Sequence, residues 1–224
     1  MLTCCNLLSG SFAVLMATQG QFYIAFLFIV IGALFDFSDG FVARMLGIAS
    51  PIGKELDSLA DVVTFGLAPS MMLFRWLFGA IGWWALLAFL MVAFSAFRLA
   101  KFNLDERQTT SFIGLATPPN ALFWASISCM PAAILQHKII AILLLCLSGV
   151  SCYLLVSEIP FFSFKSHNAA KKQNLVFGIG CLLICMLCTF FAIHYHKLSY
   201  ALFIGAACVL WYVLFNFIIN CKNQ

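Results

Sequence analysis

Apolar runs recur along this 224-residue chain, and each run of roughly 17 to 25 residues can cross a hydrocarbon core about 30 Å thick as a helix. The chain is 64% hydrophobic, with a mean hydropathy of +1.05, which lies far outside the composition of soluble domains. We therefore predict an all-α integral membrane protein, a polytopic bundle of about eight transmembrane helices.

The predicted spans follow one another without a soluble linker or an internal repeat, so residues 1–224 form a single membrane domain. The break between Gln136 and Lys138 is the weakest, and six or seven spans remain the alternative. The eight spans are residues 3–18, 21–46, 53–78, 80–100, 118–136, 138–157, 173–194 and 198–219.

Lysine and arginine residues set the predicted orientation, because basic residues are retained on the cytoplasmic side. With the N-terminus inside, the cytoplasmic side receives nine basic residues and the opposite side receives three. The nine are Arg44, Lys54, Arg98, Lys101, Arg107, Lys165, Lys171, Lys172 and Lys222, and the three are Arg75, Lys138 and Lys197. Both termini are therefore predicted to be cytoplasmic. Met1 leads almost directly into the first span without a basic segment, so no cleavable signal peptide is predicted.

The net charge of +4 favours contact with anionic lipid headgroups and phosphates. We predict no nucleic-acid partner, because the sequence offers no soluble basic module that could hold a duplex.

Acidic residues are rare in this chain, yet five of the eight fall between residues 35 and 63, namely Asp36, Asp39, Glu55, Asp57 and Asp61. The segment GIASPIG at residues 47–53 is typical of a turn between two helices. Counted from that turn, the two aspartates on each helix lie at matching depths, roughly 8 to 15 Å along the helix axis. Spacings of i, i+3 and i, i+4 place both members of each pair on one helix face. Four carboxylates are therefore predicted to converge between two antiparallel helices.

Buried carboxylates without partners are costly in a membrane, at about 2.5 to 3.5 kcal/mol each near a helix centre. Arg44 and Lys54 alone are too few and too close to the turn to neutralise four acids. Hard oxygen ligands suit Mg²⁺ or Mn²⁺, which keep coordination positions open for water and phosphate. The pattern predicts a divalent-metal site that receives a phosphate ester, with Gly40 and Ala43 leaving room for the ligand. The competing interpretation treats these acids as caps or as partners of Arg44 and Lys54.

The spacing D-x2-D-G-x2-A-R-x8-G-x3-D-x3-D resembles the signature of the CDP-alcohol phosphatidyltransferase family. The matching residues are Asp36, Asp39, Gly40, Ala43, Arg44, Gly53, Asp57 and Asp61. Within that family the chain is most similar to the phosphatidylserine synthases, through NLLSG in the first span, GKELDSLADVVTFGLAPS, and FRLAKFN followed by FIGLATPPNA. The similarity covers roughly residues 3–125.

The resemblance implies transfer of a phosphatidyl group from CDP-diacylglycerol to the hydroxyl of L-serine, with release of CMP. Asp36, Asp39, Asp57 and Asp61 would hold two divalent ions, and Asp61 would also be the general base. Gly40, Ala43, Arg44 and Gly53 would shape the CDP pocket. We also expect a role near the nucleotide for Asn6, because packing alone would not place an amide within a span.

An amino-acid acceptor brings a carboxylate that a guanidinium can bind in a bidentate manner. Arg98, Lys101 and Asn103 are therefore the candidates for binding serine, and a role as interface anchors is the alternative for Arg98 and Lys101. Glycerol 3-phosphate or an inositol phosphate is the rival acceptor, although such acceptors would need more basic residues near the site. A cation transporter is the rival from another class, but the paired broken helices typical of transporters are not visible.

The resemblance also implies a six-helix core at residues 1–157, with residues 158–224 forming a C-terminal helical extension. It implies the cytoplasmic membrane of a bacterium, with the active site facing the cytoplasm. Family members usually carry a short segment with Pro-Asn before the first span, which is missing here unless translation starts upstream. Enzymes of this kind often form homodimers, although no residue in the sequence specifies one.

Overall fold

The structure is a computed structural model that describes residues 1–47, 50–104, 112–131, 137–161 and 205–215. Nearly all of these residues are helical. The α-helices are α1 (Leu2–Thr18), α2 (Phe22–Leu46), α3 (Pro51–Asp61), α4 (Ala68–Ile81), α5 (Leu90–Leu104), α6 (Thr117–Ser128), α8 (Lys138–Val156) and Gly205–Phe215. A π-helical segment, η1 (Val62–Leu67), joins α3 to α4, and a 3₁₀ segment, η2 (Gly82–Phe89), leads into α5.

Within the residues that the structure describes, three helical stretches are long and apolar enough to cross a membrane, namely Phe22–Ala43, Pro51–Leu104 and Lys138–Val156. Leu2–Thr18 and Gly205–Phe215 are shorter apolar helices. These helices support the prediction of an all-α membrane protein. The predicted span at 173–194 lies outside the described residues, as do residues 132–136 of the fifth span and residues 198–204 and 216–219 of the last.

The turn between α2 and α3 forms where the sequence predicts it. Gly47 ends α2 in the left-handed conformation, with φ of 65°, which a glycine adopts without a steric penalty. Ser50 then caps α3, because its Oγ accepts a hydrogen bond from the Gly53 amide at 3.1 Å. Pro51 occupies the first turn of α3, where no amide hydrogen is needed. The acidic residues on α2 and α3 are thereby held on two adjacent helices.

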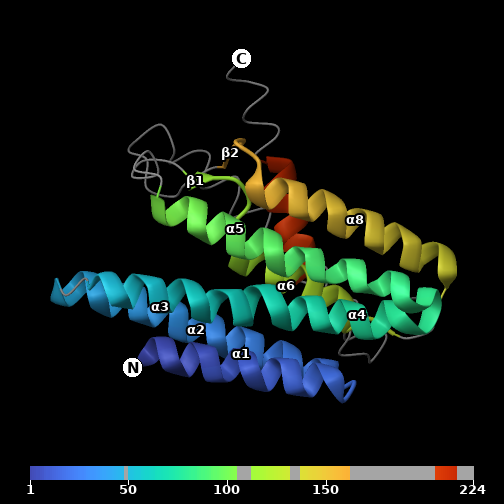
Figure 1. The fold of residues 1–224 in the computed structure, drawn as a ribbon, viewed down its shortest axis with the longest axis horizontal. Helices are drawn as coiled ribbons and strands as arrows, with labels where there is room; N and C mark the ends of the chain where they lie inside the picture. Colours follow the sequence, from blue (N-terminus) through green and yellow to red (C-terminus); the bar gives the residue numbers. More distant parts are fainter. Residues whose placement is uncertain (48–49, 105–111, 132–136, 162–204, 216–224) are drawn as a thin grey trace.

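The stretch Pro51–Leu104 reverses direction at Gly82 (Figure 1). Gly82 has φ of 60° and ψ of −137°, a conformation that side-chain-bearing residues rarely adopt. The sequence places this break near residue 79, and the structure places it at residues 81 and 82.

Helix α6 is shorter than predicted: it ends at Ser128, whereas the predicted span runs to residue 136. The amide of Met130 bonds back to the Ile127 carbonyl at 3.0 Å, which tightens the last turn. Pro131 follows, and a proline disfavours helical geometry in the residue before it.

Two buried apolar clusters hold the bundle together, and α6 contributes to both. One cluster joins α1, α2, η1 and α4 through small residues such as Ala13, Ala17 and Ala25. The other joins α4, η2, α5, α8 and the helix Gly205–Phe215 around Trp124 of α6. Small residues let helices approach closely in a membrane, where the hydrophobic effect does not drive helices together.

The turn between α2 and α3, the end of α5 and the β1–β2 pair lie toward one end of the helices (Figure 1). The β pair is a short addition to the predicted all-α fold, in which β1 (Phe112–Ile113) pairs antiparallel with β2 (Pro160–Phe161). The α4–η2 turn and the start of α8 lie at the other end.

Candidate active site

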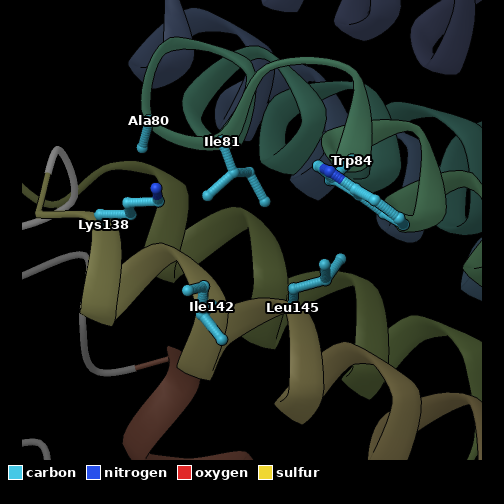
Figure 2. A pocket seen from close by; sticks show the side chains of 6 residues that line it. All are labelled: Ala80, Ile81, Trp84, Lys138, Ile142 and Leu145. Atoms are coloured by element: carbon cyan, nitrogen blue, oxygen red, sulfur yellow. The ribbon is translucent and has the colours of Figure 1, made fainter.

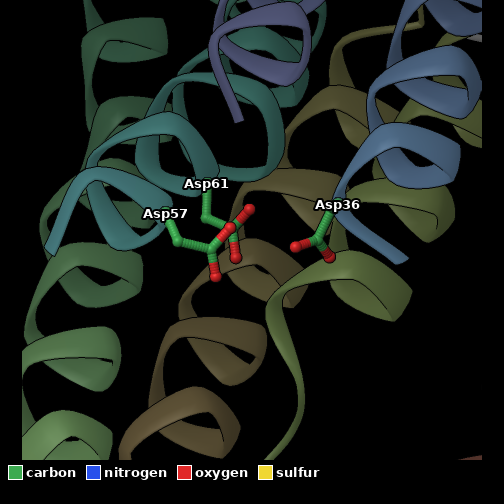
Figure 3. Close-up of side chains that lie close together, drawn as sticks. All are labelled: Asp36, Asp57 and Asp61. Atoms are coloured by element: carbon green, nitrogen blue, oxygen red, sulfur yellow. The ribbon is translucent and has the colours of Figure 1, made fainter. Parts of the chain in front are cut away.

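Three acidic side chains meet between α2 and α3, as Figure 3 shows. Asp36 comes from α2, whereas Asp57 and Asp61 come from successive turns of α3. One oxygen from each carboxylate lies within 4.8 Å of the others. Asp36 and Asp57 are half-buried, and Asp61 is only 7% exposed. The i, i+4 spacing of the two α3 aspartates places both on the face toward α2, as the sequence predicts.

Asp39, the fourth acid of the predicted set, lies outside this group of three. The hydroxyl of Thr3, at the start of α1, donates a hydrogen bond to the Asp39 carboxylate. This bond joins α1 to α2 one turn away from Asp36. The contact could not be read from the acidic window, because its partner lies 36 residues earlier in the chain.

Asp61 has a partner on α1 as well. Nδ2 of Asn6 donates to Oδ1 of Asp61 at 3.0 Å. The Asn6 side chain has no exposed surface. The fold places it against Asp61, and its expected role near the nucleotide stays a prediction.

The three converging carboxylates fit a divalent ion. Among the side chains that the structure describes, no lysine or arginine forms an ion pair with any of the three. Like charges this close repel one another, and burial adds to the cost of keeping them ionised. A bound cation would relieve both costs, and carboxylate oxygens are the ligands that Mg²⁺ and Mn²⁺ prefer.

A cavity of about 350 Å³ lies beside the three acids. Its walls come from α2, α3, α5 and the start of α6, so four segments of the chain that are distant in sequence meet here. Its lining residues are Asp36, Lys54, Asp57, Ser58, Asp61, Arg98, Leu99, Phe102, Asn103, Ala116, Thr117 and Pro118. The cavity thus combines an acidic wall with two basic residues.

Arg98 lines this cavity from α5 and is only 8% exposed. Its Nη1 donates to Oγ1 of Thr117 at 3.3 Å, and its guanidinium carbon lies 5.7 Å from the centre of the Phe102 ring. Nε of Arg98 is buried and has no hydrogen-bond partner within the described part of the chain. A buried donor of this kind favours an acceptor group brought by a ligand.

The other two candidates for binding serine are placed differently from each other. Asn103 lines the cavity, and its Nδ2 donates to Oγ of Ser58 at 2.8 Å. Lys101 is not among the lining residues and instead forms an ion pair with Glu158 at 3.2 Å. Glu158 is distant in sequence, so the pattern around Lys101 could not predict this partner.

The glycines and alanine predicted for the CDP pocket lie toward the α2–α3 turn and do not line the described wall of this cavity. Gly40 is exposed and Ala43 is half-buried. Gly53 takes part in the cap of α3 through its amide. The side chain of Arg44 lies outside the described part of the structure.

A second cavity, of about 450 Å³, lies between α4, η2 and α8 at the other end of the bundle (Figure 2). Its lining residues are Ala80, Ile81, Trp84, Lys138, Ile142 and Leu145. Lys138 is the one ionisable residue among these described lining residues. The cavity beside Asp36, Asp57 and Asp61 is therefore the stronger candidate site, because it combines three carboxylates with two basic residues.

Comparison with known proteins identifies the family of this chain. The profile of the family described as CDP-alcohol phosphatidyltransferase matches residues 1–164. The chain belongs to the CDP-alcohol phosphatidyltransferase family. Members of this family depend on divalent metal ions, and the Asp36, Asp57 and Asp61 cluster can bind one.

Several curated relatives are named CDP-diacylglycerol--serine O-phosphatidyltransferase. The protein of that name from Bacillus subtilis is 35% identical over 175 residues, which cover 78% of this chain and 94% of the relative. One from Methanocaldococcus jannaschii is 31% identical over 200 residues, or 86% of this chain and 89% of the relative. One from Helicobacter pylori is 38% identical over 125 residues, or 54% of this chain and 52% of the relative.

Proposed function

We propose that this CDP-alcohol phosphatidyltransferase makes phosphatidylserine from CDP-diacylglycerol and L-serine and releases CMP. The observation that carries the proposal is the cavity in which three converging carboxylates face a buried arginine. The relatives named for the serine reaction support it, and two of them match most of this chain.

In this proposal Asp61 is the general base. One of its oxygens takes the proton from the acceptor hydroxyl as that hydroxyl oxygen bonds to the phosphorus that carries the diacylglycerol. The bond from this phosphorus to the oxygen shared with CMP breaks, and CMP leaves with the electron pair. Asp61 suits the role because it lines the cavity and yet is only 7% exposed, which limits competition from water.

Asp36, Asp39, Asp57 and Asp61 would hold the divalent ions, two Mg²⁺ or Mn²⁺ in the proposal. When bound, such ions neutralise the charge on the diphosphate and stabilise the leaving CMP. Gly40, Ala43, Arg44 and Gly53 shape the CDP pocket, with Arg44 on a phosphate.

Arg98 binds the carboxylate of the serine acceptor. Its guanidinium is buried at the cavity wall, and its buried Nε has no hydrogen-bond partner among the described residues. Asn103 supports this end of the cavity through Ser58. Lys101 contributes less, because Glu158 already pairs with its ammonium group.

Serine is favoured over a phosphorylated acceptor by the charge of the wall. Lys54 and Arg98 are the basic residues among the described lining residues, and Nζ of Lys54 already donates to the Asn103 carbonyl at 3.0 Å. Glycerol 3-phosphate or an inositol phosphate would add a doubly charged group that this wall leaves poorly neutralised.

For the whole protein we propose about eight spans, with residues 1–157 as the catalytic core and residues 158–224 as a helical extension. The active site faces the cytoplasm of a bacterium from its inner membrane. The α2–α3 turn and the end of α5 lie toward one end of the helices (Figure 1). Lys54 near the start of α3 and Arg98 and Lys101 in the last turns of α5 support this orientation, because basic residues are retained on the cytoplasmic side. A homodimer, expected from the resemblance, is tested by the mass of the solubilised enzyme.

The test is release of CMP by the purified enzyme from CDP-diacylglycerol with Mg²⁺ or Mn²⁺ and one acceptor at a time. We expect CMP with L-serine and little with glycerol 3-phosphate or an inositol phosphate. Release only with a phosphorylated acceptor would exclude serine as the acceptor. Absence of CMP with every acceptor would exclude the enzymatic proposal.

A further inference from the structure

Helix α1 carries two polar side chains on the face toward the acidic residues. Thr3 and Asn6 are spaced i, i+3, so they lie on the same face of the helix. Thr3 donates to Asp39 on α2, and Asn6 donates to Asp61 on α3. Both are buried, with 5% and 0% of their surface exposed. One helix therefore contacts an acid on each of the two helices that form the site.

The position of Asn6 is fixed by a second hydrogen bond. Oγ1 of Thr64 donates to the main-chain carbonyl of Asn6 at 3.1 Å. Thr64 lies one turn after Asp61, where η1 continues α3. On this surface Asp61 accepts a hydrogen bond from the Asn6 side chain, and Thr64 donates one to the Asn6 carbonyl. This reciprocal pair sets the register of α1 against Asp61.

Two glycines allow the helices to approach closely enough for these bonds. A Cβ at Gly10 would lie 2.8 Å from Cα of Thr64. A Cβ at Gly32 would lie 2.6 Å from Cγ2 of Thr64 and 3.0 Å from Oδ1 of Asn6. A larger residue at Gly10 would push α1, and with it Asn6, away from Thr64 and Asp61. A larger residue at Gly32 would crowd Thr64 and the Asn6 amide.

Asn6 offers a donor to a carboxylate without adding a charge. Its amide engages Oδ1 of Asp61, which restricts rotation of the carboxylate and leaves the other oxygen for the acceptor hydroxyl. A lysine or arginine in this place would neutralise Asp61 and compete with a bound cation. Oδ1 of Asn6 is buried without a partner among the described residues, so this amide is a costly choice for packing alone.

We propose that α1 is a positioning element of the active site, in which Asn6 orients the carboxylate of Asp61 for proton transfer and Thr3 orients Asp39. This role rests on the proposed function, since it assigns the proton acceptor to Asp61. Asn6 is a positioning residue and not a catalytic one, because it acts through Asp61.

The variants Asn6→Leu and Asn6→Asp test this role. Leucine has nearly the shape of asparagine and also removes the unpartnered buried oxygen, so it should not lower the unfolding temperature in detergent. Aspartate keeps the shape and loses the donor. Ser9→Ala is the matched control, because Ser9 is also buried on α1 but donates its hydrogen bond to the Phe28 carbonyl at 2.8 Å and not to a carboxylate.

We expect both Asn6 variants to lose about 10- to 100-fold in kcat, the loss that corresponds to one hydrogen bond to a charged group. The KM for CDP-diacylglycerol should stay within about threefold, since binding of the lipid does not depend on the orientation of Asp61. Ser9→Ala should keep its kcat. For Thr3, Thr3→Val should lower kcat and Thr3→Ser should restore it, because serine retains the hydroxyl.

A normal kcat in Asn6→Leu would overturn the inference about α1. The proposed function would still stand in that case, provided that the unchanged enzyme releases CMP. A loss of kcat that Ser9→Ala shared in full would also overturn it, because the effect would then come from helix packing. An inactive unchanged enzyme would instead overturn the proposed function itself.

Discussion

The guanidinium of Arg98 donates from Nη1 to Oγ1 of Thr117 at 3.3 Å and joins the end of α5 to the first residue of α6. This bond holds Arg98 at the cavity wall, close to the acids of α3. The bond therefore links α5 and α6, two of the helices that line the cavity.

Replacing Arg98 by lysine should weaken serine binding while CDP-diacylglycerol binding changes little. Lysine keeps the charge but loses the planar donors that match a carboxylate. We expect kcat/KM for serine to fall about 10- to 100-fold in steady-state assays of CMP release. Lys101→Ala is the control and should stay within about twofold, since its ion pair with Glu158 is exposed. A larger effect from Lys101→Ala than from Arg98→Lys would contradict the assignment of the serine site.

Asp57→Asn should reduce turnover about 100-fold or more and raise the metal concentration needed for half-maximal rate, because it removes a charged ligand from the cluster. Glu55 offers the matched control on the same helix. It is exposed and lies outside the cluster, so Glu55→Gln should keep activity within about twofold. Titrations of CMP release with Mg²⁺ and Mn²⁺ measure both variants. Equal metal dependence in the two would show that Asp57 does not bind the ion.

Asp61→Asn should abolish turnover, with a loss of about 100- to 10,000-fold, because the amide cannot accept the proton of the acceptor. Metal-dependent binding of CDP-diacylglycerol should remain measurable, for example by equilibrium binding of a radiolabelled lipid to the solubilised enzyme. A variant with near-normal turnover would remove Asp61 from the role of general base.

Gly10→Ala should destabilise the protein, because the added methyl group would lie 2.8 Å from Cα of Thr64 and 2.9 Å from its main-chain nitrogen. Overpacking of this kind costs about 1 to 3 kcal/mol. Gly149→Ala on α8 is the control, since nothing lies within 4 Å of a Cβ added there. Thermal unfolding in detergent should show a lower midpoint for the first variant and an unchanged or higher one for the second. The opposite order would mean that α1 and η1 are not in close contact.

Much of the fold is readable from the sequence because the apolar runs and turn residues act locally. The predicted span at 3–18 corresponds to α1 at Leu2–Thr18, and that at 21–46 corresponds to α2 at Phe22–Leu46. The early end of α6 is harder to predict. The residues that follow Ser128 in the predicted span to residue 136 are still mostly apolar, so hydropathy continues where the helix stops.

The candidate site also has a part that the sequence predicts and a part that it does not. Asp36, Asp57 and Asp61 meet because helical spacing and one turn determine their positions, and the sequence carries both. The partners of Asp39 and Asp61 are Thr3 and Asn6, which depend on how α1 packs against the other helices. Periodicity gives the face of a helix but not which distant helix covers it, so these contacts required the structure.

The central claim is that carboxylates from α2 and α3 share a bound divalent ion. Anomalous X-ray scattering from crystals of the enzyme grown with Mn²⁺ tests it most directly. We expect a manganese peak about 2 Å from oxygens of Asp36, Asp57 and Asp61. Carboxylates that point apart, or that pair with arginine or lysine and leave the peak absent, would contradict the account.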